Sequence, residues 1–294
     1  MNPISRRTAL TMGGAGLVGT VVGGTGLWRE LSTSVLDPVA GELFTEPEVL
    51  RSTGGLLEVR LEAALGKHEV AGREATTLGY NGGVPGPTLR LRPGDTLRVE
   101  LVNRLDRGTN LHVHGLHVSP EGNGDNVFVA VDPGRAHRYE YRLPDNHPPG
   151  VYWYHPHHHG TVADQVFGGL YGAIIVEDDE EIPVDRERVM VVSDITLDSG
   201  GSLVSPSTME RMMGREGELV LVNGAAKPDL KGRSGERERW RIINACTARY
   251  LALRLPEQRA RVVGRDVGRL PRDMALEDVV LAPGNRLDLV VDLS

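Results

Sequence analysis

Residues 150–160 read Gly-Val-Tyr-Trp-Tyr-His-Pro-His-His-His-Gly, and residues 110–117 read Asn-Leu-His-Val-His-Gly-Leu-His. These two stretches hold most of the histidine in the chain. Nine of the ten histidines lie between His112 and His159, and none follows His159. A distribution this uneven points to a metal site.

The spacing of His112 and His114 fits a metal site on a β-strand. Side chains alternate between the two faces of a strand, so imidazoles two residues apart project to one side, about 7 Å apart at the backbone. A second pair, His155 and His157, can complete a small cluster. Neutral imidazole suits copper, zinc, iron and nickel, and copper(II) stands highest in the affinity order. The alternative, that these are satisfied core histidines, suits a lone histidine better than two His-X-His pairs.

Composition limits the fold and the partners. A chain of 294 residues is long enough for two domains. Its 37 glycines and 18 prolines, with only 4% aromatic residues, favour short strands joined by turns over a helical bundle. The net charge of −7 gives no basic surface for nucleic acid. The single cysteine, Cys246, excludes an intrachain disulfide and is expected to be a buried structural thiol.

The apolar pattern predicts two sets of strands. Alternating or apolar runs in the first half occur at residues 56–61, 96–101, 138–143, 152–154 and 171–176. Those in the second half occur at residues 189–192, 219–224, 239–244, 250–255 and 286–291. Both sets indicate Greek-key β-sandwiches. We expect one domain at residues 50–178 and another at 186–294, joined by the acidic segment 177–183, whose charges are expected only to be solvated.

The N-terminal segment is expected to be a signal and linker over residues 1–40, with linker character continuing to residue 53. Arg6 and Arg7 precede a glycine-rich, weakly apolar run from Thr11 to Leu27, which resembles a twin-arginine export signal. It implies a periplasmic or extracellular protein. The alternative is an uncleaved anchor or a disordered leader. Nothing after Leu27 is apolar for long enough to span a bilayer, so no stable membrane span is expected after signal removal.

Two motifs are similar to those of a known family. His112-Val-His114-Gly115 and Trp153-Tyr-His155-Pro-His157 resemble the first and second copper motifs of the multicopper oxidases, a laccase-like family built from cupredoxin domains. The resemblance runs from about Gly54 to Ser294 and includes residues 222–224, 243–245 and 281–286. It implies an all-β chain of two cupredoxin-like Greek-key β-sandwich domains. The second is expected to be incomplete, because the family pattern adds a strand and a third domain beyond Ser294.

The resemblance also implies roles for single residues. His112 would bind the type 2 copper of a trinuclear cluster, while His114, His155 and His157 would bind its type 3 pair. Asp125 lies where the family places an acid that could relay protons to dioxygen, although it could equally form an Asp-Asn loop turn.

Three further histidines, His117, His158 and His159, lie outside the ligand positions of the motifs. We expect His158 to point away from His157, on the other face of the strand. His159 and His117 are expected to be hydrogen-bonding neighbours rather than ligands.

The type 1 copper of the family needs two histidines and a cysteine, usually with an axial methionine. The second half contains no histidine, so type 1 copper is expected only in a missing C-terminal domain. Met209, Met212 and Met213 could hold copper(I), but a mobile loop leading to Gly214 is the favoured interpretation.

We therefore predict an exported laccase-like multicopper oxidase that couples oxidation of phenolic, amine or metal-ion substrates to the reduction of dioxygen to water. This chain would carry half of the cluster ligands and would be inactive alone. One alternative is a non-catalytic cupredoxin-like copper-binding protein or a truncated gene product. Another is a two-domain oxidase or nitrite-reductase relative whose cluster forms in a homo-oligomer, which the absence of a type 1 set disfavours.

Overall fold

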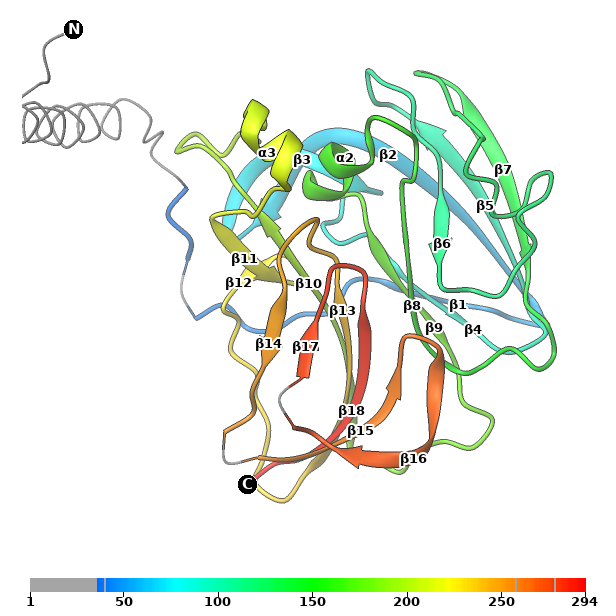
Figure 1. The fold of residues 1–294 in the computed structure, drawn as a ribbon, viewed down its shortest axis with the longest axis vertical. Helices are drawn as coiled ribbons and strands as arrows, with labels where there is room; N and C mark the ends of the chain where they lie inside the picture. Colours follow the sequence, from blue (N-terminus) through cyan, green and yellow to red (C-terminus); the bar gives the residue numbers. More distant parts are fainter. Residues whose placement is uncertain (1–35, 40, 257, 278) are drawn as a thin grey trace, which may run out of the picture.

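The computed structural model describes residues 36–39, 41–256, 258–277 and 279–294. Within these ranges the fold consists of four β-sheets and two short helices (Figure 1). The predicted all-β class is therefore confirmed. The export signal expected around Arg6 and Arg7 lies outside the described residues. None of the described helices is both long and apolar enough to cross a bilayer.

Two sheets form the first half of the molecule. The four-stranded sheet has the order β3 (Arg73–Tyr80), β2 (Leu56–Val70), β5 (Thr96–Asn103), β7 (Ala136–Arg142). The five-stranded sheet has the order β1 (Val49–Arg51), β4 (Thr88–Leu91), β9 (Gly172–Val176), β8 (Gly150–His155), β6 (His112–His114). The pairing of β2 with β5 is parallel, and the pairings of β6 with β8 and of β8 with β9 are antiparallel.

The first core lies between these two sheets. Leu97, Val99 and Leu101 alternate with more exposed residues along most of β5 and pack in one cluster with Tyr152 and Tyr154 of β8. Their alternation is the period expected of a strand with one buried face. The sandwich follows from this pattern.

Strand β8 is buried on both faces, which explains its run of apolar and aromatic residues. Tyr152 and Tyr154 belong to the first core, whereas Val151 and Trp153 belong to a second cluster that includes Val189 and other residues of the second half. The strand therefore lies between the two halves of the molecule. His155 is its last residue, so both cores hold the strand that carries this histidine.

The second half is built on a seven-stranded sheet and a two-stranded sheet, coloured yellow-green to red in Figure 1. The larger sheet has the order β12 (Ala225–Ala226), β11 (Leu219–Val222), β10 (Arg186–Ile195), β13 (Arg237–Asn244), β18 (Arg286–Asp292), β15 (Arg259–Arg265), β16 (Gly268–Ala275). The smaller sheet pairs β14 (Leu251–Leu253) with β17 (Val279–Leu281). Leu281 of β17 and Leu289 of β18 share a third core, and the expected cupredoxin-like sandwich class is confirmed.

The acidic segment 177–183 connects the two halves, between β9 and β10. The expectation that its charges are only solvated is wrong for Asp178, whose side chain is 5% exposed. Its carboxylate pairs with Arg239, with Arg241 at 3.4 Å and with Arg269 at 3.3 Å. The neighbouring Asp179 is exposed as expected. The chain changes sheet at this segment, and the domain boundaries at residues 178 and 186 stay a prediction.

The part of the expected linker that the structure describes is packed against the fold. Leu36 is buried in the second core. The Phe44 amide donates to the Asp229 carbonyl at 3.1 Å, and the Val189 amide donates to Glu46 Oε1 at 2.7 Å. Strand β1 then joins the five-stranded sheet beside β4. The sequence pattern missed these contacts because they join residues far apart in the chain.

The two described helices are α2 (Val162–Phe167) and α3 (Thr208–Met213). The loop expected at the methionine cluster is wrong, since Met209, Met212 and Met213 lie on or at the end of α3. Ser207 and Glu210 form a reciprocal capping box that starts this helix. All three methionines are exposed.

Candidate metal centre

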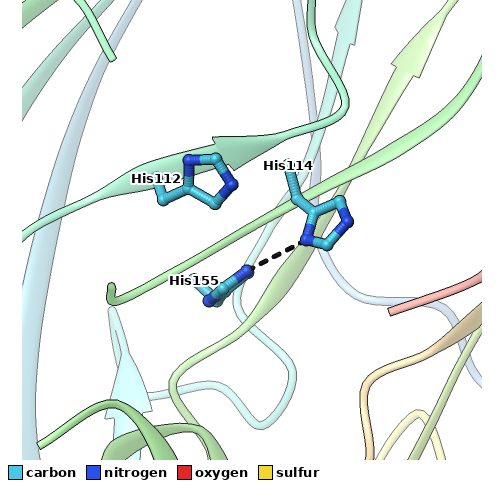
Figure 2. Close-up of side chains that lie close together, drawn as sticks. All are labelled: His112, His114 and His155. Atoms are coloured by element: carbon cyan, nitrogen blue, oxygen red, sulfur yellow. Dashed lines mark hydrogen bonds between the residues drawn. The ribbon is translucent and has the colours of Figure 1, made fainter. Parts of the chain in front are cut away.

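Three histidines come together where β6 meets the end of β8. In the antiparallel register His112 lies opposite His155, and His114 lies opposite Trp153. One nitrogen from each of His112, His114 and His155 lies within 4.8 Å of the others (Figure 2). As strand alternation requires, the rings of His112 and His114 are on the same side, with centroids 5.5 Å apart.

Hydrogen bonds occupy one nitrogen on two of these rings. His155 Nδ1 lies 2.8 Å from the Pro156 carbonyl oxygen and must donate to it, which leaves Nε2 unprotonated. That Nε2 accepts a hydrogen bond from His114 Nδ1 at 3.3 Å, drawn as the dashed line in Figure 2. His112 Nδ1 faces the Asp125 carboxylate, so its Nε2 also keeps a lone pair. Nitrogen atoms that could bind a metal therefore face one another on the three rings.

Asp125 lies in a loop turn and also contacts His112, while its role as a proton relay stays a prediction. Its backbone amide donates to the Ser119 carbonyl at 2.8 Å, within a loop turn. Its carboxylate oxygens lie 2.9 and 3.0 Å from His112 Nδ1, and Oδ1 also accepts from the Val113 amide at 3.1 Å. A carboxylate in this position fixes the tautomer and the direction of a histidine. The sequence pointed to the acid but not to this contact.

The surroundings favour the neutral form of two rings. Burial, with the Arg286 guanidinium and then His112, lowers the pKa of His114 to about 3. Burial is also the largest cause that holds the pKa of His155 well below its ordinary value, followed by the charge of His112. Only an unprotonated imidazole nitrogen can bind a metal, so both rings are available as ligands at neutral pH.

Trp153 stacks against two of the three imidazoles. Its ring centroid lies 4.1 Å from that of His155 and 5.0 Å from that of His114, and both pairs are close to parallel. The indole is 4% exposed and belongs to the second core. Residues of the second half therefore pack against Trp153, and Trp153 in turn packs against the rings of His114 and His155.

His157 lies beside the three-histidine group and is not part of it. Its ring centroid is 5.2 Å from that of His112, its backbone amide donates to Asn110 Oδ1 at 2.6 Å, and the residue is exposed. The chain leaves β8 at Pro156, so strand alternation no longer controls the direction of this side chain. The predicted ligand role of His157 stays a prediction.

The remaining histidines of the two motifs lie elsewhere. His158 Nδ1 contacts Thr161 Oγ1 at 3.3 Å, outside the strand on which its direction was predicted. His159 is exposed. The His117 backbone amide donates to Nε2 of His147 at 3.0 Å, and His147 is 2% exposed. His117 and His147 form a separate structural contact that sequence reasoning did not find.

The second half also reaches the centre. Gly284 and Arg286, in a stretch that sequence analysis noted only as a family landmark, lie against His114 and the strand that carries Trp153. Cys246 is not close to a histidine in sequence, is 3% exposed as expected, and has a pKa raised by burial. A buried thiol with a raised pKa is a poor metal ligand.

The residues present fit copper. All converging donors are imidazole nitrogens, two of the rings are held neutral, and the adjacent His157 is exposed. Imidazole donors also bind zinc, so the donor set narrows the metal without fixing it.

Comparison with known proteins identifies the family. A family model described as multicopper oxidase matches residues 63–181. The multicopper oxidase mco of Staphylococcus haemolyticus is 34% identical over 84% of this chain and 56% of its own length. Copper resistance protein A of Pseudomonas syringae pv. tomato is 28% identical over 92% of this chain and 50% of its own.

A solved structure has the same fold. The multicopper oxidase of Campylobacter jejuni, described as a metallo-oxidase, superposes with a TM-score of 0.80 at 30% identity, over 90% of this chain and 57% of its own. The chain thus spans about half the length of the relatives it matches. Copper is the metal of this family, and the chain belongs to the multicopper oxidases.

Proposed function

We propose that this chain supplies half of the ligands of a trinuclear copper cluster in a laccase-like oxidase. The observation that carries the proposal is the convergence of nitrogen atoms from His112, His114 and His155 within 4.8 Å. In this proposal His112 serves the type 2 copper, and His114, His155 and the adjacent His157 serve the type 3 pair. The exposed position of His157 supports an additional domain as the source of the other ligands.

The bound copper supplies one-electron chemistry for the reduction of dioxygen to water. The histidines of this chain would hold and orient the copper. The buried Trp153 would exclude water from its side of the centre. Reduction of dioxygen consumes protons, and the Asp125 side chain is 15% exposed while contacting His112. We propose that this carboxylate passes protons from solvent to the centre as well as orienting His112.

The reducing substrate is proposed to be a phenol, an aromatic amine or a metal ion. Its electrons would enter at a type 1 copper outside this chain, since no histidine follows His159 and Cys246 is a buried thiol. The 294-residue chain alone is therefore proposed to bind copper without turnover. The same observation favours the alternative of a copper-binding protein that has no oxidase activity.

Export is also proposed, on the basis of Arg6, Arg7 and the apolar run that follows them. Replacing both arginines by lysine should retain the protein in the cytoplasm. Unchanged export on cell fractionation would remove the twin-arginine interpretation.

Copper content tests the site directly. Alanine at His112, His114 or His155 should lower the copper bound per chain, measured by elemental analysis after loading and dialysis. His158→Ala is the matched control because its ring contacts Thr161 and not the group. Equal loss from His158→Ala, or full retention in the three variants, would contradict the proposed centre.

A further inference from the structure

We propose that the turn between β17 and β18, residues 281–286 of the second half, positions His114 as a metal ligand. The inference rests on the proposed copper centre and adds two residues to it, Gly284 and Arg286. Neither residue contacts the metal in this proposal. They act by holding the imidazole of His114 and the strand behind it.

Gly284 contacts the imidazole edge that does not face the other histidines. A Cβ atom at Gly284 would lie 3.1 Å from Cε1 and 3.6 Å from Nε2 of His114, and 3.8 Å from Trp153 Cζ2. The neighbouring ring atom Nδ1 faces His155 Nε2 at 3.3 Å. His114 is thus confined by the Trp153 face and by the Gly284 backbone, with Nδ1 directed toward His155.

Arg286 fastens the turn to the strands that carry the ligands. Its Nε donates to the Val151 carbonyl of β8 at 3.1 Å, and its Nη1 donates to the Gly284 carbonyl at 3.0 Å. A Cβ atom at Gly115, the residue after His114, would lie 2.4 Å from Arg286 Nη2. The guanidinium therefore fits against the backbone at Gly115, and only glycine leaves it room there.

The turn is itself held by the second half. The Gly284 amide donates to the Asn244 carbonyl at 2.8 Å, and the fully buried Asn244 side chain donates to the Leu281 carbonyl at 3.0 Å. The Arg286 amide donates to Asp266 Oδ1 at 2.7 Å. Because the turn is fixed at both ends, it resists displacement and can hold the His114 ring beside it in place. The second half thereby takes part in the site without supplying a ligand.

The competing explanation is that Gly284 is needed only for its backbone conformation, since its φ of +82° is strained for other residues. Gly235 separates the two explanations. It has a φ of +86° in a turn of the same half, its amide also donates to a backbone carbonyl, and a Cβ atom there would have no neighbour within 4 Å. Alanine at either position adds comparable strain, but only alanine at Gly284 displaces His114.

The experiment is a competition titration of the purified 294-residue chain with Cu(II), together with thermal unfolding of the metal-free protein. Gly284→Ala should weaken Cu(II) affinity by about 10- to 100-fold, the usual effect of losing a partner that orients a ligand. Gly235→Ala should lower the melting temperature similarly but keep the wild-type affinity. Equal Cu(II) affinities of the two variants would overturn the inference.

Two further variants complete the design. If Gly284→Ala does not fold, Arg286→Lys decides, because lysine keeps the charge but cannot hold Val151 and Gly284 together. Loss of affinity with an altered Cu(II) electron paramagnetic resonance spectrum supports positioning, and wild-type affinity and spectrum reject it. His114→Ala shows which idea has failed. If the wild-type chain binds no Cu(II), or binds it equally without His114, the proposed centre itself is wrong.

Discussion

Replacement of Asp125 by asparagine should weaken metal binding through His112, although the side chains have nearly the same shape. In the native structure Asp125 Oδ2 lies 2.9 Å from His112 Nδ1, while Oδ1 accepts from the Val113 amide at 3.1 Å. Both neighbours are donors when the proton of His112 is on Nδ1. Asparagine offers one oxygen and one amino group, so in either orientation an N–H faces another N–H.

The magnitude follows from the contact that is lost. A hydrogen bond to a charged group contributes about 1.5–3 kcal/mol. Since about 1.4 kcal/mol corresponds to a tenfold change in affinity, the loss amounts to about 10- to 100-fold. His112 relieves the conflict by moving its proton to Nε2, which removes the lone pair that faces the centre. The cost therefore falls on metal binding more than on folding.

The measurement is the dissociation constant for Cu(II) by competition, with the melting temperature of the metal-free chain measured in parallel. Asp132→Asn is the control, because it removes the same charge from an exposed turn before β7. We expect a large loss of affinity in Asp125→Asn and none in Asp132→Asn. An Asp125→Asn variant with wild-type affinity would mean that the carboxylate does not set the tautomer of His112.

Three other outcomes are expected. Asp178→Ala should destabilise the chain by about 3–5 kcal/mol, as expected when a buried ion pair loses one partner, whereas Asp179→Ala at the exposed neighbour should change stability by under about 0.5 kcal/mol in denaturant unfolding. Burial lowers the pKa of His147 below its ordinary 6.5. The contribution of neutral His147 to the stability of the folded chain is therefore complete above pH 6.5 and is lost as the pH falls through the lowered pKa. The metal-free melting temperature should accordingly drop from pH 7 to pH 5, and less steeply in His147→Gln. Copper-loaded chain should lack intense blue thiolate-to-copper absorption and consume no oxygen with a phenol, and a blue, oxygen-consuming preparation would place Cys246 at the metal.

The features that sequence predicted are those recorded in local spacing. Alternation along β5 identified a half-buried strand, and His-X-His spacing placed His112 and His114 on one side of β6. The run at residues 152–154 predicted a strand immediately before His155. Each of these inferences needs only the two-residue period of a strand, so no knowledge of distant neighbours was required.

The features that sequence missed depend on contacts between distant residues, with one exception. Arg286 donates a hydrogen bond to the Val151 carbonyl, 135 positions away. Asp178 pairs with Arg241, 63 positions away. Neither partner can be chosen from local pattern when many arginines and acids are available. The exception is α3, where Ser207 and Glu210 have the spacing of a capping box and the signal was present in the sequence.

The placement of β8 between two cores explains why one side of the centre, at His155, is buried and held firmly, whereas the other side, at His157, is exposed. Tyr154 and Trp153 anchor the strand in opposite cores immediately before His155, so displacing that histidine disturbs both. A ligand held in this way loses little freedom when a metal binds, and such preorganisation strengthens binding. His157 has left the strand and is exposed, so it retains the freedom that ordering must remove. The proposed completion of the centre by ligands from another domain suits this division, with rigid donors on the buried side and an adjustable donor on the exposed side.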